Sequence, residues 1–155
     1  MNPLFEKIYR DNSRYVYNVA LGMLRNKTEA EDIMQNVFIK LFDNYGAFRG
    51  DSDIKTYLYR MTVNKCLDLF RLQKIRANKL ESIEAPEYRP AGPNYELESI
   101  LEKLEPGVKA AVLLSEIGGF SYKEIAEIMG INLGTVKSRI HRGINKLRAL
   151  AGKEI

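Results

Sequence analysis

Apolar side chains recur three or four residues apart along most of the chain, and this spacing predicts amphipathic α-helices. The first part of the chain contains three such segments, over about residues 3–24, 29–45 and 52–77. Pro3 suits the first turn of the first segment, and Thr28 with Glu31 forms a capping box for the second. The positions expected to face the core are Leu4, Ile8, Tyr15, Val19 and Met23; then Ala30, Ile33, Met34, Val37, Phe38, Leu41, Phe42 and Tyr45; then Leu58, Tyr59, Thr62, Cys66, Leu69 and Phe70.

The last part of the chain has the pattern of two helices joined by a tight turn. Ser121 is a natural N-cap, and Glu124 completes a capping box with it. Gly130 can end this helix in the left-handed conformation, and Asn132 can cap the next helix. This order predicts a helix-turn-helix. The expected buried positions are Ile125, Ala126, Met129, Val136, Ile140, Ile144 and Leu147.

A stretch with little periodicity separates these two parts. Residues 78–95 contain three prolines and three glutamates, which is typical of a linker. A second helical unit begins near Tyr95, breaks at Pro106 and Gly107, and resumes over residues 108–117. We therefore predict an all-α protein of two small helical domains, residues 1–78 and 95–155, joined by a flexible linker over residues 79–94.

Charge is distributed unevenly along the chain. Residues 1–80 contain 14 Lys or Arg and 9 acids, residues 81–105 contain 2 and 7, and residues 106–155 contain 8 and 4. The final predicted helix has five basic residues and no acid between Asn132 and Leu150. A basic amphipathic helix is often simply solvated, but one that follows a capped helix and a tight turn favours DNA binding. The outward positions are Thr135, Ser138, His141, Arg142 and Asn145, flanked by Lys137, Arg139 and Lys146.

Composition argues against several other classes of protein. One cysteine in 155 residues excludes an intramolecular disulfide framework and a cysteine-rich zinc site. Without a signal-like or membrane-spanning apolar run, we expect a soluble, cytoplasmic protein with no membrane insertion. The sequence lacks paired carboxylates, a nucleophile with a base, metal-ligand spacing and a phosphate-binding glycine loop. We therefore expect no enzymatic activity, no cofactor and no metal.

Two polar faces in the first part of the chain are candidate binding surfaces. On the second predicted helix, Asp32, Gln35 and Asn36 lie on the same side as Ile39. An exposed isoleucine among polar groups is either accidental or part of a protein-docking surface. The third helix has a stripe of Tyr57, Arg60, Asn64 and Arg71, which is either an ordinary solvated face or a surface that stacks and holds unpaired bases.

Four segments, in order and spacing, resemble the extracytoplasmic-function sigma factors of bacterial RNA polymerase. They are EAEDIMQNVFIKLF (29–42), FRGDSDIKTYLYRMTVNKCLDLFR (48–71), FSYKEIAEIMGI (120–131) and GTVKSRIHR (134–142). The resemblance covers nearly the whole chain. It implies a transcription initiation factor, made of sigma region 2, a linker and sigma region 4. Such a factor binds core RNA polymerase and directs it to promoters by recognising −35 duplex and melted −10 DNA.

The resemblance also implies roles for particular residues and partners. The polymerase core would be contacted through its β′ coiled coil and its β flap, the latter by an apolar surface near residues 112–117. An anti-sigma factor is a further implied partner. This chain departs from the family at Tyr57, where tryptophan is common, and at Gly143 and Ile144, where Ala-Arg is frequent. The implied contacts are Asp32, Gln35, Asn36 and Ile39 to the β′ coiled coil; Phe48, Arg49, Ser52, Tyr57, Arg60 and Asn64 to the −10 element; and Thr135, Lys137, Ser138, Arg139 and Arg142 to the −35 element.

Two other classes of protein remain as alternatives on the residues alone. A conventional helix-turn-helix regulator would bind DNA as a dimer and protect two symmetric half-sites. An adaptor would act through protein contacts only, and neutralising Arg139 and Arg142 would leave it active.

Overall fold

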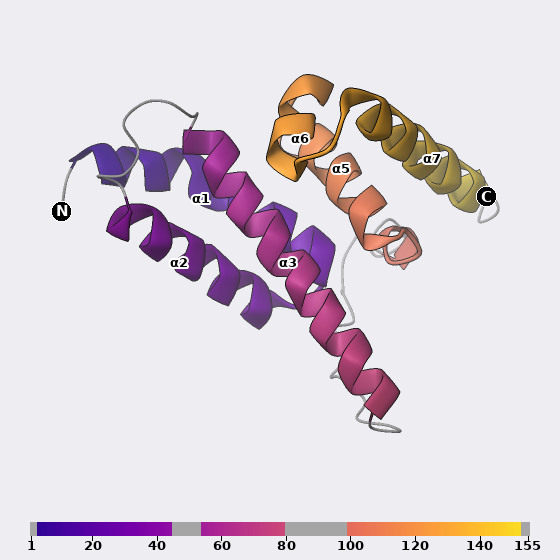
Figure 1. Ribbon diagram of the computed structural model, residues 1–155, viewed down its shortest axis with the longest axis horizontal. Helices are drawn as coiled ribbons and strands as arrows, with labels where there is room; N and C mark the ends of the chain where they lie inside the picture. Colours follow the sequence, from indigo (N-terminus) through magenta and orange to yellow (C-terminus); the bar gives the residue numbers. More distant parts are fainter. Residues whose placement is uncertain (1–2, 45–53, 80–98, 153–155) are drawn as a thin grey trace.

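The computed structural model describes residues 3–44, 54–79 and 99–152, and Figure 1 shows their arrangement. Within these ranges the regular secondary structure is helical and includes no strand, which confirms the predicted all-α class. Most of the predicted linker, and the candidate residues Phe48, Arg49 and Ser52, lie outside the described residues. The helices are α1 (Pro3–Leu24), α2 (Lys27–Asp43), α3 (Ile54–Lys79), α5 (Pro106–Glu116), α6 (Tyr122–Met129) and α7 (Leu133–Gly152).

The buried face of α1 includes Ile8, Val19 and Met23 as predicted but differs from the prediction at other positions. Leu4 and Tyr15 were expected in the core but are 45% and 49% exposed, so the prediction was wrong for both. The core stripe includes the polar Asn12, whose side-chain amide donates to the Ile8 carbonyl oxygen at 2.9 Å. This bond satisfies a donor that would otherwise be costly to bury. The buried residues of α1 are Ile8, Asn12, Val16, Val19, Ala20 and Met23.

The connection between α1 and α2 is shorter than predicted. Asn26, not Thr28, is the N-cap of α2, and its side-chain oxygen accepts from the Glu29 amide at 3.0 Å. Arg25 has a φ of 52°, a left-handed conformation that reverses the chain within two residues. The predicted capping box at Thr28 was therefore wrong, because that residue already lies inside the first turn. The predicted core of α2 is confirmed for Ala30, Ile33, Val37, Phe38 and Leu41.

Residues 54–70 of α3 pack against the core, where Leu69 and Phe70, predicted to be core residues, are half-buried. Leu58, Tyr59, Thr62 and Cys66 are buried as predicted, and burial raises the pKa of the Cys66 thiol to about 12. Cys66 is therefore a protonated packing residue at neutral pH. Residues 71–79 are exposed, and this end of α3 projects beyond the other helices (Figure 1).

In the second half of the chain, α7 crosses α5 closely at Gly143. A Cβ atom added at Gly143 would lie 2.6 Å from Val112 Cγ2 and 2.9 Å from Val108 Cγ1. Glycine in the middle of a helix normally costs about 1 kcal/mol relative to alanine. Here it permits the contact between α5 and α7, which gives a structural reason for this departure from the family pattern.

Replacing Gly143 with alanine should therefore destabilise the protein despite alanine's higher helix propensity. We expect the free energy of unfolding in urea to fall by about 1–3 kcal/mol, as is typical of overpacked cores. Gly152→Ala is the matched control, because a Cβ added there meets no atom within 4 Å. If both substitutions leave stability unchanged or raise it, this packing explanation is incorrect.

The two halves of the chain pack directly on each other, with α5 against α1 and α6 against α3 (Figure 1). Lys109 on α5 is buried at this boundary, where its Nζ donates to the Met23 carbonyl oxygen at 2.8 Å. The same ammonium lies 5.4 Å from the centroid of the Phe70 ring on α3. Burial lowers the pKa of Lys109 to about 8, an effect that the Glu102 carboxylate partly opposes. Holding this charge between the halves therefore costs free energy at neutral pH.

Lys109 should make stability depend on pH. Its pKa is about 8 in the folded chain against an ordinary value of 10.5, so unfolding takes up a proton between these values. The contribution of Lys109 to the free energy of unfolding is complete above its ordinary pKa. This contribution is lost as the pH falls through the pKa of the folded chain. Between about pH 7 and 9, the free energy of unfolding should rise by about 1 kcal/mol more in the wild type than in Lys109→Met.

Thermal or urea denaturation of both proteins at each pH measures this difference. The comparison is needed because Cys66 lies near Lys109 and has a raised pKa, which acts in the opposite direction above about pH 9 in both proteins. Arg25 and Glu102 also face Lys109 and are retained in both. A pH-independent difference would contradict the expected burial of this ammonium.

Candidate nucleic-acid interface

The predicted helix-turn-helix is present with its caps. The Ser121 hydroxyl accepts from the Glu124 amide at 3.2 Å, and the Glu124 carboxylate accepts from the Ser121 amide at 2.9 Å. These hydrogen bonds lower the pKa of Glu124 below its usual value. Gly130 ends α6 with a left-handed φ of 67°. Asn132 accepts from both the amide and the hydroxyl of Thr135, at 2.8 and 2.9 Å, which fixes the start of α7.

Three of the five candidate DNA contacts lie on the exposed side of α7. Val136, Ile140 and Gly143 are buried, whereas Lys137, Ser138 and Arg142 are exposed. His141 and Asn145 are exposed as well, which confirms the predicted outer face except at Thr135, which is half-buried. Ile144 and Leu147, predicted in the core, are half-buried, and the sequence pattern omitted Gly143 because it has no side chain.

The other two candidate DNA contacts, Thr135 and Arg139, are half-buried and contact residues of the second half of the chain. The Thr135 hydroxyl donates to the Asn132 side chain. The Arg139 guanidinium lies against the start of α5, since a Cβ added at Gly107 would be 3.0 Å from Arg139 Nη1. These contacts position both side chains beside the exposed face formed by Lys137, Ser138 and Arg142.

The candidate docking residues of α2 share one exposed face. Asp32, Gln35 and Asn36 are exposed, and Ile39 is 55% exposed. An exposed isoleucine flanked by amide and carboxylate groups is suited to a protein contact.

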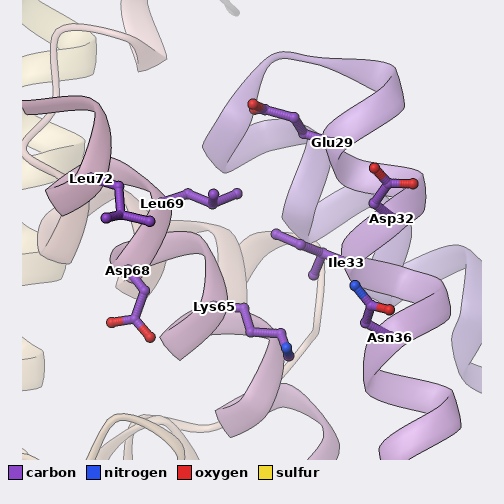
Figure 2. Close-up of a pocket in the computed structure, with 8 residues that line it drawn as sticks. All are labelled: Glu29, Asp32, Ile33, Asn36, Lys65, Asp68, Leu69 and Leu72. Atoms are coloured by element: carbon purple, nitrogen blue, oxygen red, sulfur yellow. The ribbon is translucent and has the colours of Figure 1, made fainter. Parts of the chain in front are cut away.

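A hollow of about 450 Å³ between α2 and α3 adjoins this face (Figure 2). Its walls combine carboxylates with apolar side chains. The α3 wall was not predicted as part of a site, because Leu69 was expected in the core and Leu72 follows it at helical spacing. The lining residues are Glu29, Asp32, Ile33, Asn36, Lys65, Asp68, Leu69 and Leu72.

The candidate base-binding stripe on α3 is partly engaged within the protein. Asn64 is exposed and Tyr57 is half-buried. Arg60 reaches the end of α6, where Nε donates to the Ile128 carbonyl oxygen at 3.3 Å and Nη2 donates to that of Glu127. A candidate DNA contact of the first half is thus held by the helix-turn-helix of the second half.

The apolar surface expected near residues 112–117 is not presented to solvent. Val112, Leu113 and Leu114 are buried, so this expectation was wrong for the conformation described. Leu113 packs on α1, because a Cβ added at Gly22 would lie 3.0 Å from its methyl groups. The physical reason is that α5 lies between α7 on one side and α1 on the other.

Within residues 3–44, 54–79 and 99–152, no cluster of His, Cys, Asp or Glu is arranged to hold a metal ion. Among the described helices, none has the length and apolar character needed to cross a bilayer.

The fold defines an all-α protein with a capped helix-turn-helix, a motif that places its second helix in the major groove of DNA. Comparison with known families is more specific. Residues 8–75 match the family "Sigma-70 region 2", and residues 95–147 match "Sigma-70, region 4". The chain belongs to the extracytoplasmic-function sigma factors of the sigma-70 family, which are promoter-specific transcription initiation factors rather than catalysts.

Similar proteins include two named as factors of RNA polymerase. The ECF RNA polymerase sigma-E factor of Escherichia coli K12 is 32% identical over 83% of this chain and 78% of its own length. The ECF RNA polymerase sigma factor SigE of Mycolicibacterium smegmatis is 36% identical over 97% of this chain, which spans 63% of that relative.

Two solved structures share the fold. The sigma factor RpoE in complex with the anti-sigma factor NepR, from Bartonella quintana, has a TM-score of 0.80 and covers 96% of both chains at 23% identity. CnrH in complex with the cytosolic domain of CnrY has a TM-score of 0.76 and 23% identity, with 97% of this chain and 89% of that chain covered.

Proposed function

We propose that this sigma factor holds −35 duplex DNA with α7 and uses its first half to dock on RNA polymerase and to bind unpaired −10 bases. The main support is the capped helix-turn-helix, whose outer face exposes Lys137, Ser138 and Arg142 opposite its packed side. The first residues of such a helix reach base edges in the major groove. In this proposal the polymerase supplies the chemistry, and the sigma factor contributes no catalytic group.

Recognition of the −35 element would divide between phosphate and base contacts. Lys137 supplies a point charge suited to phosphate, whereas Arg142 can form two parallel hydrogen bonds to a guanine edge. Thr135, Ser138 and Arg139 lie beside them, near the start of α7. Neutralising phosphates releases counterions, so promoter binding should weaken steeply with salt.

The exposed face of α2 would dock on the β′ coiled coil. Ile39 provides apolar area that is unfavourable in water and favourable in an interface. Asp32, Gln35 and Asn36 surround it with polar groups that can orient a partner. An anti-sigma factor is a further proposed partner, as in the complex of RpoE with NepR. The site of action would be the cytoplasm, where polymerase and DNA are found.

The first half would also stabilise the melted −10 element. Tyr57 can stack on a base, and Arg60 and Asn64 can hold its edges or the neighbouring phosphate. Phe48, Arg49 and Ser52, which lie outside the described residues, are assigned to the same role on the family resemblance alone. Because these contacts require unpaired bases, their binding energy favours the open DNA over the closed duplex.

Run-off transcription with core RNA polymerase on fragmented genomic DNA tests this function. We expect RNA to start at defined sites that share two asymmetric upstream elements, and to require both proteins. Symmetric protection of two half-sites by the sigma factor alone would instead indicate a conventional regulator. Failure to form a joint complex with core polymerase, or to start RNA at a defined site, would refute the proposal.

A further inference from the structure

The boundary between the two halves of the chain differs from an ordinary core, because it contains buried charges. The Lys109 ammonium is 4% exposed and donates to the Met23 carbonyl oxygen. Arg25 is 9% exposed and pairs with Glu102, and its Nε has no hydrogen-bond partner within the described chain. Buried charges oppose an interface unless they are fully paired. This boundary is therefore easier to separate than an apolar interface of the same size.

Apolar contacts at the same boundary keep the halves together. The rings of Tyr59 on α3 and Phe120, which precedes α6, meet edge to face with centroids 4.7 Å apart. Leu113 of α5 packs against Gly22 of α1, where no larger residue would fit without movement. The closed arrangement thus combines specific packing with a cost in charge burial, which is a suitable balance for a reversible contact.

The packing of the two halves against each other also occupies groups that the proposed function requires. The Arg60 guanidinium donates to the carbonyl oxygens of Glu127 and Ile128, so its donors on this side are unavailable to a DNA strand. These carbonyls lie at the carboxyl end of α6, where the helix dipole adds to their attraction for a cation. Leu113, within the stretch assigned to the β flap, is covered by α1.

We propose that this packing is a self-inhibited state, in which the helix-turn-helix domain occupies Arg60 of the first domain until the two separate. The inference rests on the proposed function of Arg60 and adds to it an internal competitor for the −10 strand. No anti-sigma factor is needed for this inhibition, although one could reinforce it by binding the closed chain more tightly than the open chain.

A reversible cross-link provides the test. Gly22→Cys and Leu113→Cys are combined in a Cys66→Ala background, so that only the introduced thiols can pair. A Cβ at Gly22 would lie 3.6 Å from Leu113 Cγ, so thiols introduced at the two positions would lie close to each other in the closed chain. We expect the free protein to cross-link rapidly on oxidation. Run-off transcription should then fall at least tenfold and recover when the bond is reduced.

The outcomes separate this inference from the proposed function. Equal transcription by the oxidised and reduced protein would overturn self-inhibition, as would failure of the thiols to pair in the free protein. If wild-type protein starts no RNA with core polymerase, the proposed function fails instead. The cross-linking yield still reports closure in that case. The Leu113→Cys single variant in the same Cys66→Ala background, oxidised and reduced, controls for effects of the reagents and leaves Gly22 unchanged.

A variant that opens the chain tests the converse and avoids dependence on a cross-link. Glu102→Lys replaces the partner of Arg25 with a like charge on a side chain that is 55% exposed, so the change perturbs the boundary more than the core. We expect about a threefold to tenfold gain in transcription at limiting sigma factor. Glu116→Lys makes the same charge change at the exposed end of α5. Equal effects of the two variants would count against the inference.

Discussion

Replacing Arg142 with alanine is expected to remove most promoter-directed transcription without unfolding the protein. Arg142 is exposed on the outer face of α7, so truncating it opens no cavity in the core. Loss of a bidentate contact to a base costs about 1–3 kcal/mol, which corresponds to roughly fivefold to 150-fold in affinity. Titrating promoter DNA with the reconstituted polymerase complex measures this change.

Arg148→Ala is the matched control for this experiment. Arg148 is also exposed on α7 and has the same charge, but it lies almost two turns beyond Arg142. We expect it to lower affinity only slightly, mainly through the general attraction of DNA for positive charge. Equal losses from both variants would show that α7 acts by bulk charge and that Arg142 reads no base.

Replacing Ile39 with alanine should weaken binding to core RNA polymerase by about tenfold. Ile39 is 55% exposed in the free protein, and burying such a side chain in an interface is worth about 1.5 kcal/mol or more. The substitution should leave thermal stability nearly unchanged, because it removes apolar area from solvent. Fluorescence titration of labelled protein with core polymerase gives the affinity.

Leu4→Ala provides the comparison for the docking surface. Leu4 is 45% exposed and lies on α1, outside the proposed interface. Its removal should not alter the affinity for polymerase. If Ile39→Ala behaves in the same way as Leu4→Ala, the exposed face of α2 is not the docking surface.

The helix-turn-helix could be predicted from the sequence because its signals are local. Ser121 and Glu124 lie within one turn, and Gly130 and Asn132 each act on the residues next to them. The phase of α1 was harder to predict, because Asn12 occupies a core position and Tyr15 does not. Apolar periodicity alone cannot identify a buried amide that is satisfied by its own helix.

Contacts between distant residues were not predictable from periodicity. In the sequence, Arg60 is one member of a polar stripe on α3. No neighbouring residue indicates that it donates hydrogen bonds to the backbone carbonyl oxygens of residues 127 and 128. The sequence alone indicates that Gly143 is unfavourable inside a helix. The structure shows that Val108 and Val112 occupy the space beside it. Both features depend on how the helices meet in space.

The central position of α5 limits how long the separated chain can persist. This helix is buried over nearly its whole length, and Leu113 and Leu114 are no more than 4% exposed. Separation of the domains would expose to solvent the side of α5 that faces α1. An exposed apolar surface of this kind favours self-association. The separated protein would therefore tend to aggregate unless a partner covers this side of α5.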